Sequence, residues 1–229
     1  MDKNFKPVRS VYDNNHDAIK NIMFLYNIDQ FDLDCTYSKG SFWKNLKGPK
    51  NKTDLIPTSD DVILANSESL PFEPESMKTV MYDPPFVICG KKYRENKAGS
   101  SIIAKRFEGY ETYDDLTKNY YNTLKELYRV TEKGGLIIMK TQDTVSGGKN
   151  HFTHVMVMNM AMEIGFYPRD LIILTSKGRI SSFGAKWHRQ QHARKYHSYF
   201  LVLEKVKPRV GYDFSQFTEQ DLSVTQDTL

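Results

Sequence analysis

The stretch that decides the fold is Lys78-Thr79-Val80-Met81-Tyr82-Asp83-Pro84-Pro85-Phe86. It begins as a short apolar strand and ends in an acid. Proline has no N–H to donate to a β-ladder, so the two prolines predict that the strand stops at Asp83. We therefore expect Asp83 at the carboxyl end of a strand, which is where open α/β sheets bind ligands.

The two prolines also make the turn after Asp83 stiff, and they hold the acid beside Phe86. The carboxylate and the carbonyl of Pro84 can accept hydrogen bonds from an exocyclic amino group, while Phe86 stacks on the ring that carries this group. The alternative is an ordinary strand-to-loop turn with an aromatic plug. The flanking sequence has to decide between the two interpretations.

Length and composition limit the class of protein to which this chain can belong. A chain of 229 residues with 39% hydrophobic and 26% charged residues is typical of a soluble α/β domain with a sizeable core. No apolar run is long enough to span a bilayer, and the start of the chain lacks the apolar segment of a signal peptide. The two cysteines, Cys35 and Cys89, form no CxxC pair. This pattern predicts a cytoplasmic location, no disulfide and no structural zinc.

Positive charge is concentrated in two stretches. Residues 87–107 carry a net charge of +5 and residues 176–197 carry +6, so the rest of the chain carries −7 against a total of +4. Charge distributed in this way favours a polyanionic partner such as nucleic acid, and the alternative is a pair of solvated loops.

The first third of the chain predicts a helix over 16–27 and a short strand that ends near Asp34. A turn of small residues follows (Thr36, Ser38, Gly40 and Ser41), and then an aromatic-led helix start. Such a turn brings backbone N–H groups together and suits a carboxylate or phosphate, although a plain connection would look similar. A second strand over 52–57 holds Asp54, 14 residues after Gly40, where doubly wound folds bind ribose hydroxyls. A third strand is predicted over 60–66.

The second half also alternates helices and strands. An amphipathic helix is predicted over 114–131, stopped by Gly134 and Gly135, and a buried strand over 136–139. The methionine-rich stretch 153–164 is typical of a core helix that Gly165 ends. Strands over 170–175 and 198–203 complete the pattern, and we expect residues 208–229 to form a polar tail.

The order and spacing of these motifs resemble the S-adenosylmethionine-dependent amino-methyltransferases, which methylate exocyclic amino groups of nucleobases. The Asp-Pro-Pro-Phe form is most similar to the adenine N6 enzymes, and in particular to small phage and bacterial DNA methyltransferases. Two further motifs carry the resemblance, the stretch 66–72 and the run 192–199. The chain departs from the pattern at Ser38, where a glycine is usual, and at Cys35, where a proline is frequent. It also shows no separate target-recognition domain.

The resemblance implies a Rossmann-like α/β fold. This would be a mostly parallel seven-stranded sheet with helices on both faces and an antiparallel last strand. Residues 1–207 would form a single methyltransferase domain, followed by the tail 208–229. The basic stretch 176–197 would overhang the site. The cofactor would be S-adenosylmethionine and the substrate nucleic acid, DNA before RNA, in the cytoplasm of a bacterium or a phage-infected cell. The resemblance leaves open whether the chain pairs with itself or with another protein.

The resemblance also assigns roles to residues. The catalytic motif would be Asp83, Pro84, Pro85 and Phe86. The cofactor would contact Asp34, Thr36, Tyr37, Ser38, Gly40, Asp54, Asn66 and Ser67. Nucleic acid would contact Lys91, Lys92, Arg94, Lys105, Arg106, Arg189, Arg194 and Lys195. The target base would be flipped out of its stack and methylated directly, with no covalent enzyme intermediate.

Several alternatives stay open. The target could be an RNA adenine or a cytosine N4 amino group, or the chain could be a catalytically weak subunit that binds nucleic acid. A methyltransferase for proteins or small amines is disfavoured by the basic stretches. His188, His192 and His197 are close in sequence, but Arg189 stands where a zincin needs glutamate, so we predict no metal site.

Overall fold

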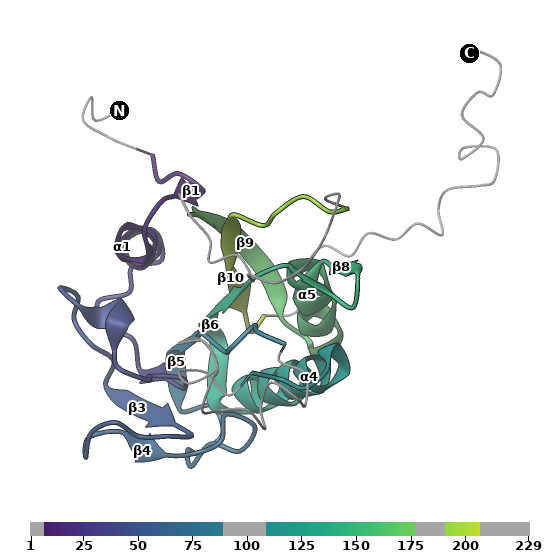
Figure 1. Cartoon of the computed structure of the whole chain (residues 1–229). Helices are drawn as coiled ribbons and strands as arrows, with labels where there is room; N and C mark the ends of the chain where they lie inside the picture. Colours follow the sequence, from purple (N-terminus) through teal and green to yellow (C-terminus); the bar gives the residue numbers. More distant parts are fainter. Residues whose placement is uncertain (1–6, 89–108, 177–190, 207–229) are drawn as a thin grey trace, which may run out of the picture.

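The computed structural model describes residues 7–88, 109–176 and 191–206. Its main feature is one twisted sheet with helices on both sides (Figure 1). In chain order, its elements are β1 Val11–Tyr12, α1 Asn15–Leu25, β2 Leu33–Asp34, the 3₁₀ helix η1 Ser41–Trp43, β3 Asn51–Asp54, β4 Ile63–Leu64, β5 Met77–Tyr82, α4 Tyr113–Val130, β6 Thr131–Thr141, β7 Thr144–Ser146, β8 Lys149–His151, α5 Thr153–Ile164, β9 Tyr167–Thr175 and β10 His197–Glu204.

The described part of the sheet has eight strands in the order β1-β9-β10-β6-β5-β2-β3-β4. β10 is antiparallel to both of its neighbours, β6 and β9, and the other pairs are parallel. The predicted α/β fold with an antiparallel last strand is thus confirmed. The predicted count of seven is wrong because Val11 and Tyr12 add β1 at one edge, paired in parallel with Ile173 and Leu174 of β9.

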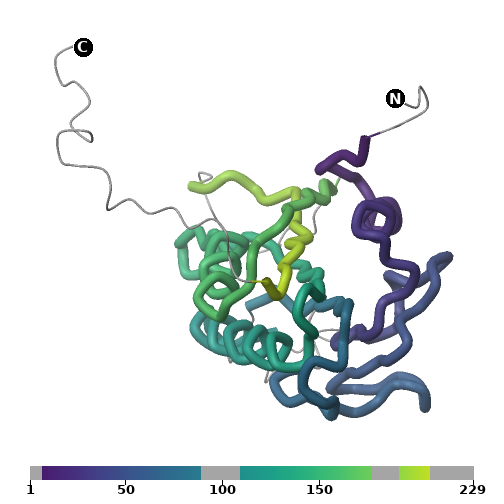
Figure 2. Tube along the Cα trace, turned by 180° about the vertical axis from the view of Figure 1, so that it is seen from behind, coloured from purple at the N-terminus to yellow at the C-terminus, as the bar shows by residue number. Residues whose placement is uncertain are grey.

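β5 lies in the middle of the sheet, and its apolar end Val80–Tyr82 is buried on both faces. Val80 and Tyr82 pack in the core cluster on the side of α4 and α5, while Met81 packs in the cluster on the side of α1. The two views agree that α1 covers one face and that α4 and α5 cover the other (Figure 2). The strand that leads to Asp83 is therefore held rigidly from both sides.

Local capping explains where the helices begin and end. The Asn14 side chain accepts the N–H of Asp17 at 2.8 Å and starts α1. Thr112 and Asp115 form a reciprocal capping box at the start of α4. Gly165, at a φ of 117°, ends α5 as predicted.

The predicted end of α4 is within one residue of the observed end, but the glycines do not stop it. The helix stops at Val130 and the chain passes directly into β6, so Gly134 and Gly135 lie inside a strand. The pairing of β5 with β6 shifts register between Met77 and Thr79, next to these glycines. A Cβ on Gly135 would lie 2.8 Å from the carbonyl oxygen of Lys78, so the glycine there permits close approach of two backbones.

The remaining predicted strands are present, although β4 spans only two residues of the predicted 60–66. The aromatic-led helix start is the 3₁₀ helix η1. Most of each basic stretch and the whole of the tail 208–229 lie outside the described residues. In the described part of the chain, no helix is both long and apolar enough to cross a membrane.

Candidate active site

Asp83 lies directly after β5, at the rim where the carboxyl ends of three neighbouring strands meet. Asp34 of β2 pairs with Met81, and Tyr82 pairs with Met139 of β6. Just beyond the ladder, the Asp83 N–H donates to the Thr36 hydroxyl at 2.7 Å. This hydrogen bond ties the predicted catalytic motif to the predicted cofactor turn.

The carboxylate of Asp83 is left partly unsatisfied. Its Oδ1 is buried and has no hydrogen-bond partner among the described residues, although the side chain as a whole is 28% exposed. Lys140 Nζ lies 3.9 Å from Oδ1. Burial raises the pKa of Asp83, and the lysine charge acts in the opposite direction. A buried acceptor without a donor is costly, and a ligand that donates a hydrogen bond at this rim would satisfy it.

The proline turn is held by a contact that the sequence did not reveal. Tyr120 of α4 is fully buried and donates its hydroxyl to the carbonyl of Pro85 at 3.0 Å. Its ring makes edge contacts with Tyr82 and Tyr110. Phe86 follows, partly exposed. The predicted stacking by Phe86 and the predicted use of the Pro84 carbonyl stay predictions.

Unlike Oδ1 of Asp83, both oxygens of Asp34 accept hydrogen bonds from described residues. It is 3% exposed, and its two oxygens accept the Trp43 indole N–H at 2.7 Å and the Thr36 N–H at 3.0 Å. Burial raises the pKa of Asp34 to about 7, although both hydrogen bonds favour the charged form. Asp34 therefore shapes the turn from within.

The turn from Tyr37 to Gly40 contains two left-handed residues. Ser38 has a φ of 50° and Gly40 a φ of 65°. The Ser38 N–H donates to Asp54 at 2.7 Å, and the other oxygen of Asp54 accepts the N–H of Ile56 at 2.9 Å. A serine is strained at positive φ, so Asp54 stabilises a bend for which glycine would be the usual residue.

Apolar surface flanks this turn. Leu55 and Ile56 directly follow Asp54 at the carboxyl end of β3, and each is 61% exposed. The sequence did not reveal their exposure, because the predicted strand 52–57 includes both residues and aliphatic strand positions are ordinarily buried. A bent turn, an acid and exposed aliphatic side chains together fit a ligand that carries both a charged group and a ring.

Asn66 and Ser67 differ in environment. Asn66 is exposed, and its side chain accepts the N–H of Glu68. Ser67 is buried, and its hydroxyl lies 3.2 Å from that of Thr123. Glu68 accepts hydrogen bonds from Asn119 and Asn122 of α4 and so anchors this loop to the helix. Asn119 also accepts the Tyr110 hydroxyl at 2.6 Å, which links the loop to the segment that follows the proline turn.

Buried polar residues at the end of β6 complete the rim. Asp143 is 2% exposed and contacts His154 Nδ1 at 2.7 Å, and it accepts the Tyr199 hydroxyl at 3.2 Å. The sequence gave no indication of these partners of Asp143. In the described ranges, no group of His, Cys, Asp and Glu is arranged to hold a metal ion.

Of the residues predicted to contact nucleic acid, two lie in the part of the chain that the structure describes. Arg194 is exposed, and Lys195 Nζ lies 5.5 Å from the centre of the Phe152 ring. The remaining predicted contacts, Lys91, Lys92, Arg94, Lys105, Arg106 and Arg189, lie outside the described residues.

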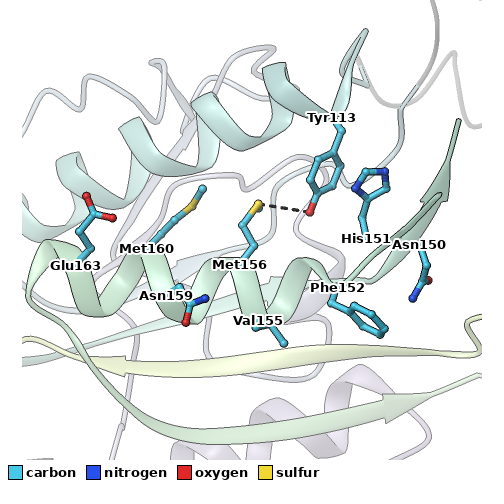
Figure 3. A pocket seen from close by; sticks show the side chains of 9 residues that line it. All are labelled: Tyr113, Asn150, His151, Phe152, Val155, Met156, Asn159, Met160 and Glu163. Atoms are coloured by element: carbon cyan, nitrogen blue, oxygen red, sulfur yellow. Dashed lines mark hydrogen bonds between the residues drawn. The ribbon is translucent and has the colours of Figure 1, made fainter. Parts of the chain in front are cut away.

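A separate cavity of about 480 Å³ lies along α5 (Figure 3). Figure 3 shows Tyr113 and His151 beside one another at one end, where their rings stack at 3.8 Å. The Tyr113 hydroxyl points to Met156 Sδ at 3.4 Å. The lining contains none of the predicted catalytic or cofactor residues, so this cavity is distinct from the rim around Asp83.

Comparison with known proteins gave one family and several solved structures. A family model described as a DNA methylase matches residues 77–228, which is more than half of the chain. No curated protein matches the sequence.

Similar solved structures include a putative DNA modification methylase from Thermus thermophilus, which is 15% identical with a TM-score of 0.42 over 69% of this chain and 61% of that one. The cytosine-N4-specific PvuII DNA methyltransferase is 16% identical, with a TM-score of 0.43 over 63% and 49%. An S-adenosylmethionine-dependent methyltransferase from Methanosarcina mazei is 10% identical, with a TM-score of 0.47 over 81% and 97%. The chain spans about 61% of the length of the Thermus protein.

Proposed function

Because the chain belongs to the DNA methylase family of amino-methyltransferases, whose cofactor is S-adenosylmethionine, we propose that it methylates the N6 amino group of adenine in DNA. The observation that carries this proposal is the buried Oδ1 of Asp83, which has no donor among the described residues. An amino group of a base is a donor of suitable size and polarity. Phe86, two prolines further on, supplies a ring on which the base can stack.

In this proposal, each part of the rim has a defined task. Asp83 and the Pro84 carbonyl accept hydrogen bonds from the two amino hydrogens, which directs the nitrogen lone pair away from the ring plane. Tyr120 fixes the turn through the Pro85 carbonyl. Catalysis then depends on orientation and on fixed charges rather than on a covalent intermediate.

The amino nitrogen must lose a proton when it gains a methyl group. In this proposal, the Asp83 carboxylate accepts that proton once the methyl group has been transferred. Because burial raises its pKa, it is a better proton acceptor than an ordinary aspartate. S-adenosylmethionine supplies the electrophilic methyl group when it is bound.

We propose that the cofactor is held by residues on the neighbouring strand ends. The backbone from Thr36 to Gly40 would face its charged amino-acid end, and Asp54 its ribose. Leu55 and Ile56 offer apolar surface to the adenine ring, with Asn66 and Ser67 near its polar edge. The bend at Ser38 and the exposed aliphatic pair support this placement.

DNA binding is the second part of the proposal. The basic residues of 87–107 and 176–197 would neutralise phosphates. The logarithm of the association constant for duplex DNA should then fall linearly with the logarithm of the salt concentration, with a slope near −0.9 for each phosphate contact. Replacing Arg189 and Arg194 by alanine should flatten the slope by up to about two units and weaken all sequences alike. An affinity that does not depend on salt would contradict this assignment.

The deciding experiment uses methylation-free DNA, RNA of the same sequence and S-adenosylmethionine with a labelled methyl group. Nucleosides released by digestion are separated and identified by mass spectrometry. We expect label in N6-methyldeoxyadenosine. Label in N4-methyldeoxycytidine, or only in RNA, would overturn the adenine or DNA part of the proposal. Label at a carbon atom, or on protein alone, would overturn amino methylation.

A further inference from the structure

Three neighbouring strands place Asp83, Lys140 and Phe200 side by side. Tyr82 pairs with Met139, so the next residues along β5 and β6 are Asp83 and Lys140. Lys140 in turn pairs with Phe200 of β10. Alternate residues of a strand share a face, and Met81, Ile138 and Phe200 pack in one core cluster. Asp83 and Lys140 therefore lie on the sheet face that α1 covers.

Lys140 is an unusual residue for this position. It follows the apolar run 136–139 and is only 9% exposed. Its Nζ lies 4.9 Å from the centre of the Phe42 ring and 5.7 Å from that of Phe200. Burying an ammonium group is costly unless it is paired. Within the described residues, its ion-pair partner is Asp83.

The distance between the two charges is informative. At 3.9 Å, Nζ stabilises the carboxylate electrostatically without a hydrogen bond to Oδ1, which keeps its lone pairs free. Cation–π interactions with the two phenylalanine rings stabilise the ammonium group. The carboxylate thus has a counter-charge and an open acceptor at the same time.

Other ionisable groups of the described chain also face Asp83. On β2, Asp34 is a second buried carboxylate, and the charge of Asp83 helps to raise its pKa. On α4, Tyr120 is buried, and Asp83 contributes to raising its pKa as well. Lys140 is the cation among these described neighbours. Without the lysine, the charges of the Asp34 and Asp83 carboxylates would repel one another with no cation from position 140 to compensate.

We propose that Lys140 is a positioning residue that holds the Asp83 carboxylate in its charged, hydrogen-bond-accepting form during methyl transfer. This inference rests on the proposed function of Asp83. Lys140 acts through Asp83, and the reaction itself needs no contact between the lysine and the base. A neutral side chain at position 140 favours the protonated acid, and a protonated carboxyl presents an O–H donor to the amino group whose hydrogen bond it should accept.

The sign of the pH effect follows from the charges. Activity requires ionised Asp83, so it falls as pH drops through the pKa of this group in the folded enzyme. Burial raises that pKa and Lys140 lowers it. Removing the lysine charge should therefore move the acidic limb of the pH–rate profile to higher pH.

The experiment compares Lys140→Met, Lys140→Arg and the exposed Lys118→Met by single-turnover methyl transfer to DNA between about pH 5 and pH 9, a range that spans the expected shift. We expect the activity of Lys140→Met relative to wild type to fall progressively as the pH drops and to recover at high pH. Lys140→Arg should keep the acidic limb near its wild-type position, and Lys118→Met should match wild type. A loss for Lys140→Met that is equal at every pH would overturn the proposal, because a packing defect does not titrate.

A second readout separates this inference from the proposed function. The ¹³C resonance of the Asp83 carboxyl, assigned by its absence in Asp83→Asn, reports ionisation directly and needs no substrate. We expect its midpoint to rise in Lys140→Met even if the wild-type enzyme methylates a different base. An unchanged midpoint would overturn the role of Lys140. If Lys140→Met does not fold, the pH–rate profile and the carboxyl titration are measured on Lys140→Gln, and the same outcomes support or overturn the proposal.

Discussion

Asp34 and Asp83 stand at the carboxyl ends of adjacent parallel strands, yet their hydrogen bonding is opposite. Both oxygens of Asp34 accept hydrogen bonds from within the turn, from Trp43 and Thr36. Oδ1 of Asp83 accepts none within the described residues. Burial raises the pKa of both acids, so burial alone does not distinguish them. The use of their oxygens does: Asp34 holds the turn together, whereas Asp83 keeps an acceptor open for the role that we propose for it.

Asp54 belongs with Asp34 in this comparison. Its two oxygens accept the N–H groups of Ser38 and Ile56 and set the bend between them. The predicted cofactor region is therefore largely formed by its own hydrogen bonds. Substitutions there should change stability and cofactor affinity together, whereas substitutions at the catalytic motif should change the rate alone.

Asp34→Ala should have the largest effect on stability. It leaves the Trp43 indole N–H and the Thr36 N–H buried without an acceptor, at a cost of about 1–3 kcal/mol each. We expect the free energy of unfolding in urea to fall by roughly 2–4 kcal/mol with little change in m-value. Asp60→Ala, at an exposed aspartate, is the control and should stay within about 0.5 kcal/mol of wild type. A stable Asp34→Ala variant that merely loses activity would show that Asp34 is a ligand contact.

Tyr120→Phe should have a smaller and more selective effect. It removes the hydroxyl that holds the Pro85 carbonyl, which is worth about 1 kcal/mol, and it keeps the buried ring. We expect a severalfold fall in the methyl-transfer rate with unchanged affinity for S-adenosylmethionine, measured by calorimetry. Tyr121→Phe is the matched control because its hydroxyl bonds to Glu163 at the surface instead. Equal rates for the two variants would mean that the Pro85 contact does not position the motif.

Ser38→Gly should have the smallest effect. Glycine removes the strain of a φ of 50°, worth about 1 kcal/mol, but it adds freedom to the unfolded chain. We expect stability within about 1 kcal/mol of wild type and equal or modestly tighter cofactor binding.

Gly40→Ala provides the opposite test of the same turn. Its new Cβ would be 2.5 Å from the Tyr37 hydroxyl oxygen at a φ of 65°, so we expect a loss of about 1–2 kcal/mol. If Ser38→Gly instead weakens binding severalfold or more, the serine hydroxyl itself contacts the cofactor.

The sequence predicted the parts of the fold that depend on local chemistry. Two prolines keep β5 from extending past Asp83, which directly follows its last residue Tyr82, and Gly165 ends α5, because each acts on its own backbone. The glycines after α4 were misplaced because the reason for Gly135 is the approach of Lys78 from another strand. β1 was missed because two residues become a strand only through pairing with β9, far along the chain.

At the site, too, local motifs were recognised from the sequence, whereas contacts between distant segments were not. The Asp-Pro-Pro-Phe motif is local and was recognised from its residues. Lys140 was not recognised, because a lysine after an apolar run looks like the exposed end of a strand, and only the register of β5, β6 and β10 brings it to Asp83. The internal role of Asp34 depends on Trp43, which η1 turns back toward it.

The central claim is that Asp83 acts in methyl transfer and does not build the site. The most direct test is Asp83→Ala, with S-adenosylmethionine affinity measured by calorimetry and methyl transfer to DNA measured in a single turnover. We predict cofactor affinity within a few-fold of wild type and transfer reduced about a hundredfold or more, the usual cost of losing one positioned acceptor. Transfer within a few-fold of wild type, or a loss of cofactor binding equal to the loss of transfer, would contradict the account.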